Sequence, residues 1–105
     1  MSRGRRLHER IELRLEVEVE HDSRRFDATT RNISLGGMYI VTGEALKLGD
    51  PLRLRFQLPE LERPTECEAA VRWQGPDGYG VQFGSLRALD VWGINQLFRE
   101  RNARG

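Results

Sequence analysis

Apolar and charged residues alternate along much of this chain, and the alternation predicts short strands. Between residues 11 and 20 every odd position is apolar and every even position is charged. A period of two is typical of a strand with one face in a core and the other in water, so we expect a first strand there. After a turn at His21-Asp22-Ser23, a second alternating strand begins at Phe26 and runs into the segment 31–39.

Four more strands and one helix follow from the same pattern. The predicted strands cover residues 38–41, 52–58, 67–73 and 79–83. Pro59 and the turn sequence Gly75-Pro76-Asp77-Gly78 mark the ends of two of them. Ser85 is a suitable N-cap for a helix from Leu86 to about Arg101. Six short strands and one helix predict an all-β-dominated fold, a six-stranded antiparallel split β-barrel with a C-terminal α-helix.

The length and charge distribution suggest how the chain is organised. With 105 residues it has the length of one domain with a modest core. We expect a flexible basic arm over residues 1–10, the barrel and helix over 11–101, and a tail over 102–105. The arm carries four arginines against one glutamate, although the net charge of the chain is only +1. No apolar run approaches the ~20 residues of a membrane span and no signal peptide is evident, so we expect a cytoplasmic protein without a membrane span.

The residues offer little support for catalysis or metal binding. His8 lies in the arm and His21 in a predicted turn, and neither has a serine or cysteine at a local spacing that would form a catalytic pair. No HExxH sequence, P-loop or cluster of metal ligands is present. Cys67 alternates with apolar residues, which predicts a buried core thiol. We therefore expect no enzyme, no metal and no cofactor.

The segment from Arg31 to Tyr39 combines polar groups with two glycines. Asn32 and Ser34 are two residues apart, so on an extended backbone they point to the same face. Their carboxamide and hydroxyl could together meet a flat polar ligand, which Gly36 and Gly37 would allow to approach the backbone. Taken alone, these residues are explained more simply by a bulge or a tight turn between two strands.

The basic arm supplies charge of the complementary kind. Arg6 and Arg10 flank three residues immediately before the first strand, and Arg5 adds a third guanidinium. A flexible arm with several guanidiniums can close over an anionic ligand and become ordered as it does so. The alternative is a solvated basic tail.

Together, these two segments resemble the PilZ domain, a bacterial receptor module for the second messenger cyclic di-GMP. Arg6-Leu7-His8-Glu9-Arg10 fits the pattern RxxxR, and Asn32-Ile33-Ser34-Leu35-Gly36-Gly37 fits [D/N]xSxxG. The resemblance extends over nearly the whole chain, because Val71-Arg72-Trp73 and Tyr79-Gly80-Val81-Gln82-Phe83 look like later strands of the family. It implies a six-stranded barrel that binds the ligand on its outer surface.

The resemblance also implies which residues bind. The candidate ligand-binding residues are Arg5, Arg6, Arg10, Asn32, Ser34, Gly36, Gly37 and Trp73. In this interpretation the arginines hold the phosphates and guanines of cyclic di-GMP, and the residues of the second motif contact a guanine edge and the backbone nearby.

Three of these positions need separate comment. Asn32 stands where many members of the family have aspartate, so we expect weaker selection of guanine. An arginine at the position of Arg5 accompanies, in the family, the binding of a stacked pair of ligand molecules. Trp73 can lie beside the site, but its alternation with the apolar residues of its strand favours a place in the core.

Three functions are compatible with the sequence. The first is a cyclic di-GMP receptor whose arm is disordered without ligand and wraps onto the barrel with it, so that an unidentified partner protein reads the new surface. The second is a small-barrel nucleic-acid binder that uses Arg53, Arg55 and Arg72. Against it, these arginines are interleaved with acidic residues and no row of exposed aromatic residues is evident. The third is an interaction module that keeps the barrel and binds no nucleotide.

Overall fold

The computed structural model describes residues 10–104 and contains seven strands and one helix. In chain order these are β1 (Ile11–Glu12), β2 (Glu16–His21), β3 (Arg24–Ile33), β4 (Gly37–Val41), β5 (Pro51–Phe56), β6 (Thr65–Gln74), β7 (Gly78–Phe83) and α1 (Ala88–Arg104). Within these residues α1 is the one helix, and it has neither the length nor the apolar run that crossing a membrane requires.

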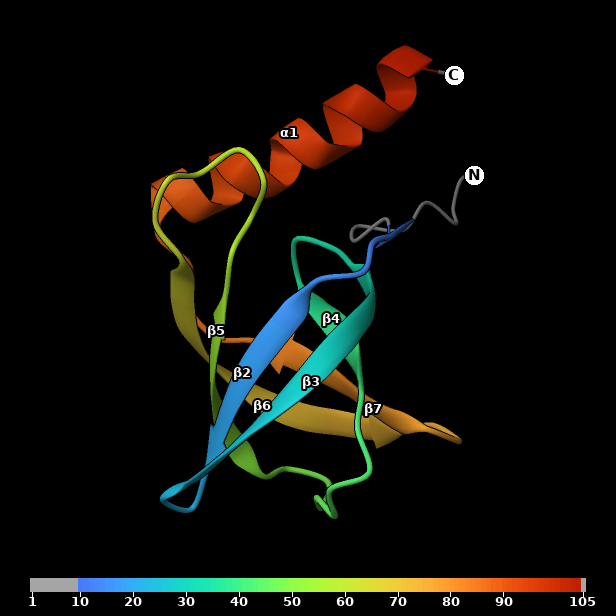
Figure 1. Ribbon diagram of the computed structural model, residues 1–105, viewed down its shortest axis with the longest axis vertical. Helices are drawn as coiled ribbons and strands as arrows, with labels where there is room; N and C mark the ends of the chain where they lie inside the picture. The colour runs from blue at the N-terminus through green and yellow to red at the C-terminus, as the bar shows by residue number, and fades with distance from the viewer. Residues whose placement is uncertain (1–9, 105) are drawn as a thin grey trace, which may run out of the picture.

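Six of the strands close into an antiparallel barrel (Figure 1). Their order is β3-β2-β5-β6-β7-β4, and β4 pairs back onto β3 to close it. The short strand β1 is additional and pairs with the end of β3. The predicted six-stranded antiparallel barrel with a C-terminal helix is confirmed.

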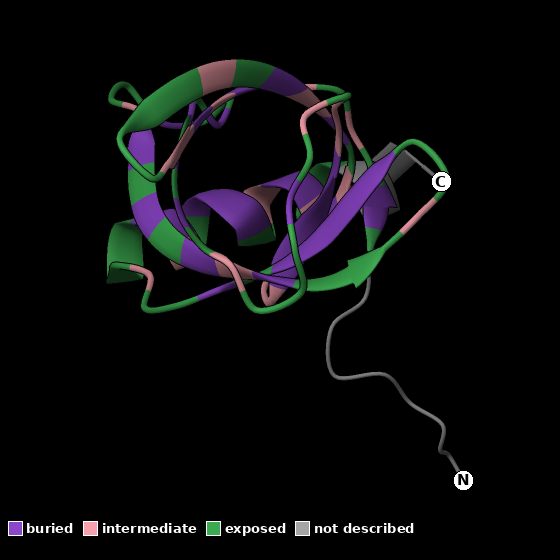
Figure 2. Ribbon diagram, turned by 90° about the horizontal axis from the view of Figure 1, so that it is seen from below, coloured by how far each residue is buried: buried purple, intermediate pink, exposed green. Residues whose placement is uncertain are grey.

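Buried and exposed residues alternate along β5 and most of β6 (Figure 2), and the buried apolar residues form the core. In β5 the three apolar residues are buried, whereas Arg53 and Arg55 are exposed. Cys67 lies in this core, where burial raises the pKa of its thiol to about 11. It is therefore the buried thiol that the sequence predicted.

A buried polar cluster anchors α1 across one end of the barrel (Figure 1). The Asp90 carboxylate is fully buried and accepts hydrogen bonds from the Thr65 hydroxyl at 2.8 Å and from the Arg87 backbone N–H at 3.2 Å. The Arg87 guanidinium donates to the same carboxylate at 3.1 Å. Burial raises the pKa of Asp90, but the hydrogen bonds from Arg87 and Thr65 outweigh burial and hold that pKa below its ordinary value. Because Thr65 belongs to β6, the cluster ties the start of the helix to the barrel.

Three boundaries differ from the prediction. Residues 11–20 form two strands rather than one, because the ladder is interrupted between Glu12 and Glu16. His21 ends β2 instead of lying in a turn. The helix begins at Ala88 rather than Leu86 and continues to Arg104. Alternation and helical period locate elements well, but they do not detect an interruption that leaves the apolar pattern unchanged.

We predict that Asp90→Ala lowers the free energy of unfolding by about 1–3 kcal/mol, because the buried Thr65 hydroxyl loses its acceptor. The folded-state pKa of Asp90 lies below its unfolded value of about 4, so its contribution is present above pH 4 and is lost as the pH falls through the folded-state pKa. Urea unfolding at pH 7 and at several values below pH 4 measures the difference between wild type and variant. The exposed Asp27→Ala serves as the control, with an expected change of less than about 0.5 kcal/mol. A difference for Asp90→Ala that stays constant into strong acid would contradict the assignment.

Candidate functional site

The additional strand β1 brings the end of the basic arm to the second motif. Ile11 pairs with Ile33 and Glu12 pairs with Asn32, so the residue before β1 lies next to the end of β3. That residue is Arg10, and its guanidinium donates a hydrogen bond to the Asn32 carboxamide oxygen at 2.5 Å. The last arginine of RxxxR therefore contacts the first residue of NxSxxG. Arg5 and Arg6 lie outside the described residues.

A β-bulge turns Asn32 away from the core. The pairing of β3 with β4 shifts by one residue between Thr30 and Asn32, so that Arg31 is an extra residue in β3. Thr30 before the bulge and Ile33 after it are both buried, and Asn32 is only half-buried. With an unbroken period of two, Asn32 would share the inward face of Thr30. The bulge therefore makes the carboxamide accessible from outside the barrel.

A second bulge does the same for Trp73. The pairing of β6 with β7 shifts between Val71 and Trp73, which leaves Arg72 as the extra residue. Trp73 is 49% exposed, so the prediction that it belongs to the core is wrong. Its indole lies over Gly80, where an added Cβ would be 2.0 Å from the indole Nε1. The missing side chain at Gly80 makes room for the ring.

Asn32 and Trp73 are the accessible ends of one row of residues that crosses four neighbouring strands. Tyr39 pairs with Asn32 on one side and with Gly80 on the other, and Gly80 pairs with Trp73. We call Asn32, Tyr39, Gly80 and Trp73 the cross-strand row. The Tyr39 and Trp73 ring centroids are 5.1 Å apart and the rings are tilted by 32°. A carboxamide and two packed aromatic rings thus lie in line, with Arg10 at one end.

Two residues that the sequence did not reveal hold Tyr39 in place. The Tyr39 hydroxyl donates to the Asp77 carboxylate at 2.7 Å, and the Arg31 guanidinium donates to both oxygens of that carboxylate. The guanidinium carbon also lies 5.4 Å from the centre of the Tyr39 ring. Hydrogen bonds from Arg31 and Tyr39 hold the pKa of Asp77 below its usual value, while burial and the bond to Asp77 raise the pKa of Tyr39. The sequence around Asp77 indicated only a turn, and no local pattern linked Asp77 to positions 31 and 39.

Ser34 and Gly37 shape the turn after Asn32 instead of facing outwards. The Ser34 hydroxyl is fully buried and accepts hydrogen bonds from the N–H groups of Gly36 and Gly37 at 3.1 and 3.2 Å. A Cβ on Gly37 would lie 2.0 Å from the Val81 carbonyl oxygen, so this glycine allows β7 to approach β4. The expectation that Asn32 and Ser34 share an accessible face is therefore wrong, because β3 ends at Ile33 and the Ser34 hydroxyl is buried in the turn that follows.

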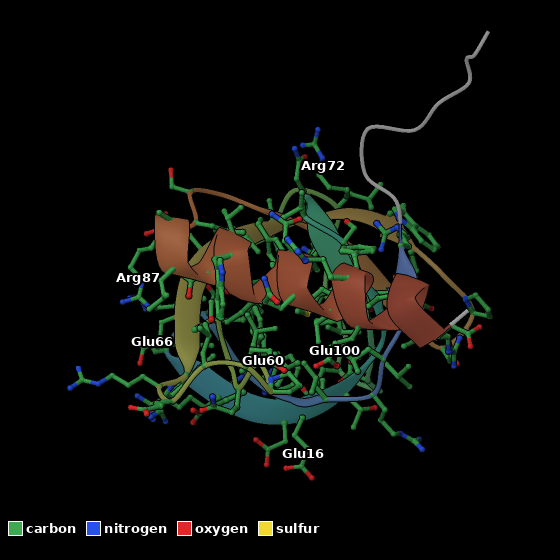
Figure 3. The ribbon with its side chains drawn as sticks, turned by 90° about the horizontal axis from the view of Figure 1, so that it is seen from above. Glu16, Glu60, Glu66, Arg72, Arg87 and Glu100 are labelled. Atoms are coloured by element: carbon green, nitrogen blue, oxygen red, sulfur yellow. The ribbon has the colours of Figure 1, made fainter. Side chains whose placement is uncertain are left out.

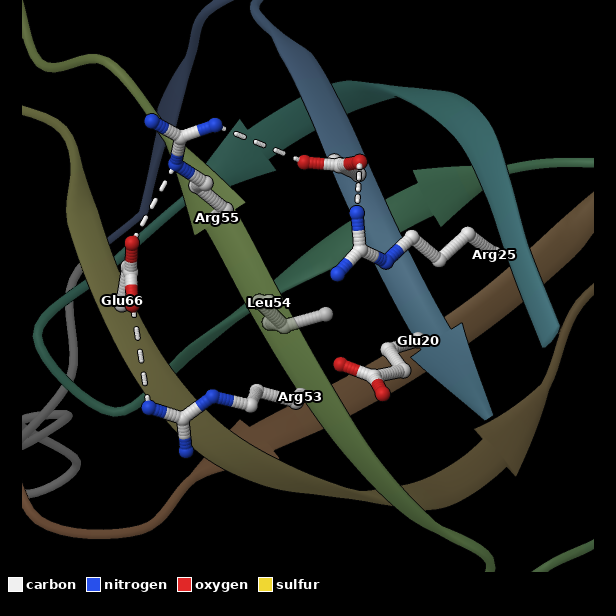
Figure 4. A pocket seen from close by; sticks show the side chains of 7 residues that line it. Glu20, Arg25, Arg53, Leu54, Arg55 and Glu66 are labelled. Atoms are coloured by element: carbon white, nitrogen blue, oxygen red, sulfur yellow. Dashed lines mark hydrogen bonds and ion pairs between the residues drawn. The ribbon is translucent and has the colours of Figure 1, made fainter. Parts of the chain in front are cut away.

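The strand arginines of the nucleic-acid hypothesis lie mostly in ion pairs. Glu18 lies 3.7 Å from Arg55, Arg55 lies 3.2 Å from Glu66, and Glu66 lies 3.7 Å from Arg53 (Figure 4). Each of these side chains is about a third or more exposed, so each pair adds little stability. The pairs nevertheless neutralise this face. Arg72, the bulged residue of β6, projects into solvent (Figure 3).

Residues 4–99 match the model of the PilZ domain. The chain belongs to the PilZ domain family. A comparison of the sequence with curated proteins gave no match.

Solved structures agree with this family. This PilZ domain is similar to the Bacillus subtilis inhibitor of motility MotI/DgrA, with a TM-score of 0.82 and 28% identity over 96% of this chain, which spans about half (53%) of that protein. It shares the fold of the PilZ domain of Escherichia coli YcgR, solved with c-di-GMP, with a TM-score of 0.71 and 17% identity over 96% of this chain and 95% of the other. Borreliella burgdorferi PlzA in complex with c-di-GMP has a TM-score of 0.65 and 15% identity over 88% of this chain and 40% of PlzA.

Two glycine-to-alanine variants test the geometry of the site. We predict that Gly37→Ala lowers the free energy of unfolding by about 2 kcal/mol or more, because its Cβ meets the backbone of β7. Gly80→Ala lowers the free energy of unfolding by less, about 1 kcal/mol, because the atom in the way of its Cβ belongs to an exposed indole that can move. Thermal unfolding compares the stabilities, and the fluorescence of Trp73 reports the displaced indole in Gly80→Ala. An equal decrease in the free energy of unfolding for the two variants would contradict this account.

Proposed function

We propose that this PilZ domain is a receptor for cyclic di-GMP, which binds on the outer surface of the barrel between the basic arm and the cross-strand row. The observation that carries the proposal is the hydrogen bond between Arg10 and Asn32, which joins two motifs 22 residues apart. Membership of the PilZ family supports it, as do the related structures of YcgR and PlzA solved with c-di-GMP.

The chemistry of the ligand fits the residues at this place. Cyclic di-GMP carries two phosphates, which suit the guanidiniums of Arg5, Arg6 and Arg10. Its guanine edges offer donors and acceptors that match the carboxamide of Asn32. The half-exposed ring of Trp73 offers a face for a purine, and such stacking is worth about 1–3 kcal/mol per base.

The remaining candidate residues have a supporting role in this proposal. Ser34, Gly36 and Gly37 fix the turn that follows Asn32 and so hold its carboxamide in position. Because Asn32 is neutral, it selects guanine less strongly than an aspartate at this position. Arg5 favours a stacked pair of ligand molecules, a stoichiometry of two per domain.

The signal passes on through the arm in this proposal. Ligand binding draws the part of the arm before Arg10 onto the barrel, because the guanidiniums of Arg5 and Arg6 gain charge-assisted contacts with the phosphates. A partner protein then recognises the surface that the ordered arm and the ligand form together. A nucleic-acid binder has less support, since Arg53 and Arg55 are paired with acidic residues.

Replacement of both motif arginines tests the site. We predict that Arg6→Ala with Arg10→Ala abolishes the binding of cyclic di-GMP while the barrel stays folded, because the RxxxR motif precedes the barrel strands in the sequence and Arg10 is exposed. Titration calorimetry measures binding, with the linear dinucleotide as ligand control. The matched control variant is Arg53→Ala, which removes an exposed arginine on another face and leaves affinity unchanged. Unchanged affinity in the double variant would defeat the site assignment.

The two tryptophans of the chain allow a spectroscopic test of the cross-strand row. Trp73 and Trp92 are 49% and 47% exposed, so each serves as a control for the other. In Trp92→Phe only Trp73 emits, and we predict that cyclic di-GMP quenches its fluorescence by stacking. In Trp73→Phe only Trp92 emits, and its fluorescence stays unchanged. The opposite pattern would place the ligand near α1 rather than on the row.

A further inference from the structure

The segment that carries Arg10 joins the barrel through a third bulge. Between β1 and β2, the three residues Leu13–Leu15 face only two residues of β3, Thr30 and Arg31. The Leu13 N–H donates to the Arg31 carbonyl at 3.2 Å, and the Thr30 N–H donates to the Leu15 carbonyl at 2.9 Å. Arg14 is therefore the extra residue, and the regular ladder is interrupted here.

The hydroxyl of Thr30 bridges this interruption. It donates to the Leu13 carbonyl at 2.5 Å and accepts from the Leu15 N–H at 2.8 Å. Thr30 is 2% exposed, so water does not compete for these bonds. The Thr30 side chain thus holds the backbone on both sides of Arg14. Its hydroxyl supplies hydrogen-bond partners that the bulge removes from the ladder.

The strand that this bridge supports, β1, is too short to be stable by itself. β1 has two residues and pairs with β3 alone. Isolated strand pairs of this length are not stable in water, so the position of β1 depends on the residues that connect it to β2. The register of β1 in turn sets Arg10 against Asn32.

We infer that Thr30 is a positioning residue of the ligand site, whose hydroxyl fixes β1 so that Arg10 lies in place before the ligand arrives. The inference rests on the proposed function. Thr30 does not touch the ligand, since its side chain is buried beneath the bulge. Without the hydroxyl, β1 detaches part of the time, and only the attached fraction of molecules offers a complete site.

Three variants of the full chain separate this role from others. Thr30→Val keeps the shape and removes the hydroxyl, and we expect its affinity for cyclic di-GMP in calorimetry to fall about tenfold. Thr30→Ser restores the hydroxyl and binds within about twofold of wild type. The matched control is Thr29→Val, the same substitution at the neighbouring half-buried position, which leaves affinity unchanged.

Amide hydrogen exchange gives the second readout. In Thr30→Val the Leu13 amide, which is bonded to Arg31, exchanges faster, while amides of β5 and β6 keep wild-type rates. Unchanged affinity in Thr30→Val overturns the inference, as does faster exchange throughout the barrel, which would indicate a general role in stability. If the wild type binds no cyclic di-GMP, the proposed function fails. In that case the exchange of the Leu13 amide alone decides whether Thr30 holds β1.

Discussion

The strict alternation of a closed barrel is the constraint on which the site depends. Each strand residue must point into the core or out to water, and a pattern set at one end of a strand holds to the other end unless a residue is inserted. Here β3 and β6 each contain one insertion, Arg31 and Arg72, and the residue after each faces outwards. A third, Arg14, precedes β2. All three inserted residues are arginines, whose long side chains can leave the barrel surface for water.

The rigid and the charged parts of the site come from different places in the chain. The barrel surface supplies flat and neutral groups, because the charge of Arg31 is neutralised by Asp77 and the cross-strand row contains a carboxamide and two aromatic rings. Among the described residues, Arg10 brings positive charge to the Asn32 end of the row. Under the proposed function, the barrel orients the bases of the ligand and the arm responds to its phosphates.

Much of the fold followed from the sequence, and much of the site geometry did not. The six barrel strands, the helix and the buried Cys67 were predictable because alternation reports burial directly. Trp73 was misassigned because Val71-Arg72-Trp73 keeps the apolar and polar alternation across the bulge, which only the pairing with β7 reveals. The contact between Asp77 and Arg31 was not predicted for another reason. The two residues are 46 positions apart and meet through barrel closure, which no local pattern encodes.

The buried thiol in β6 has a practical consequence. The sequence contains one cysteine, and with a pKa of about 11 only about one thiol in ten thousand is ionised at neutral pH. Since maleimide dyes and nitroxide spin labels react with the thiolate, the native protein is nearly inert to them. A single cysteine engineered near the start of the chain would then take up the label alone, and the distance from that probe to the barrel could be followed with no need to remove Cys67.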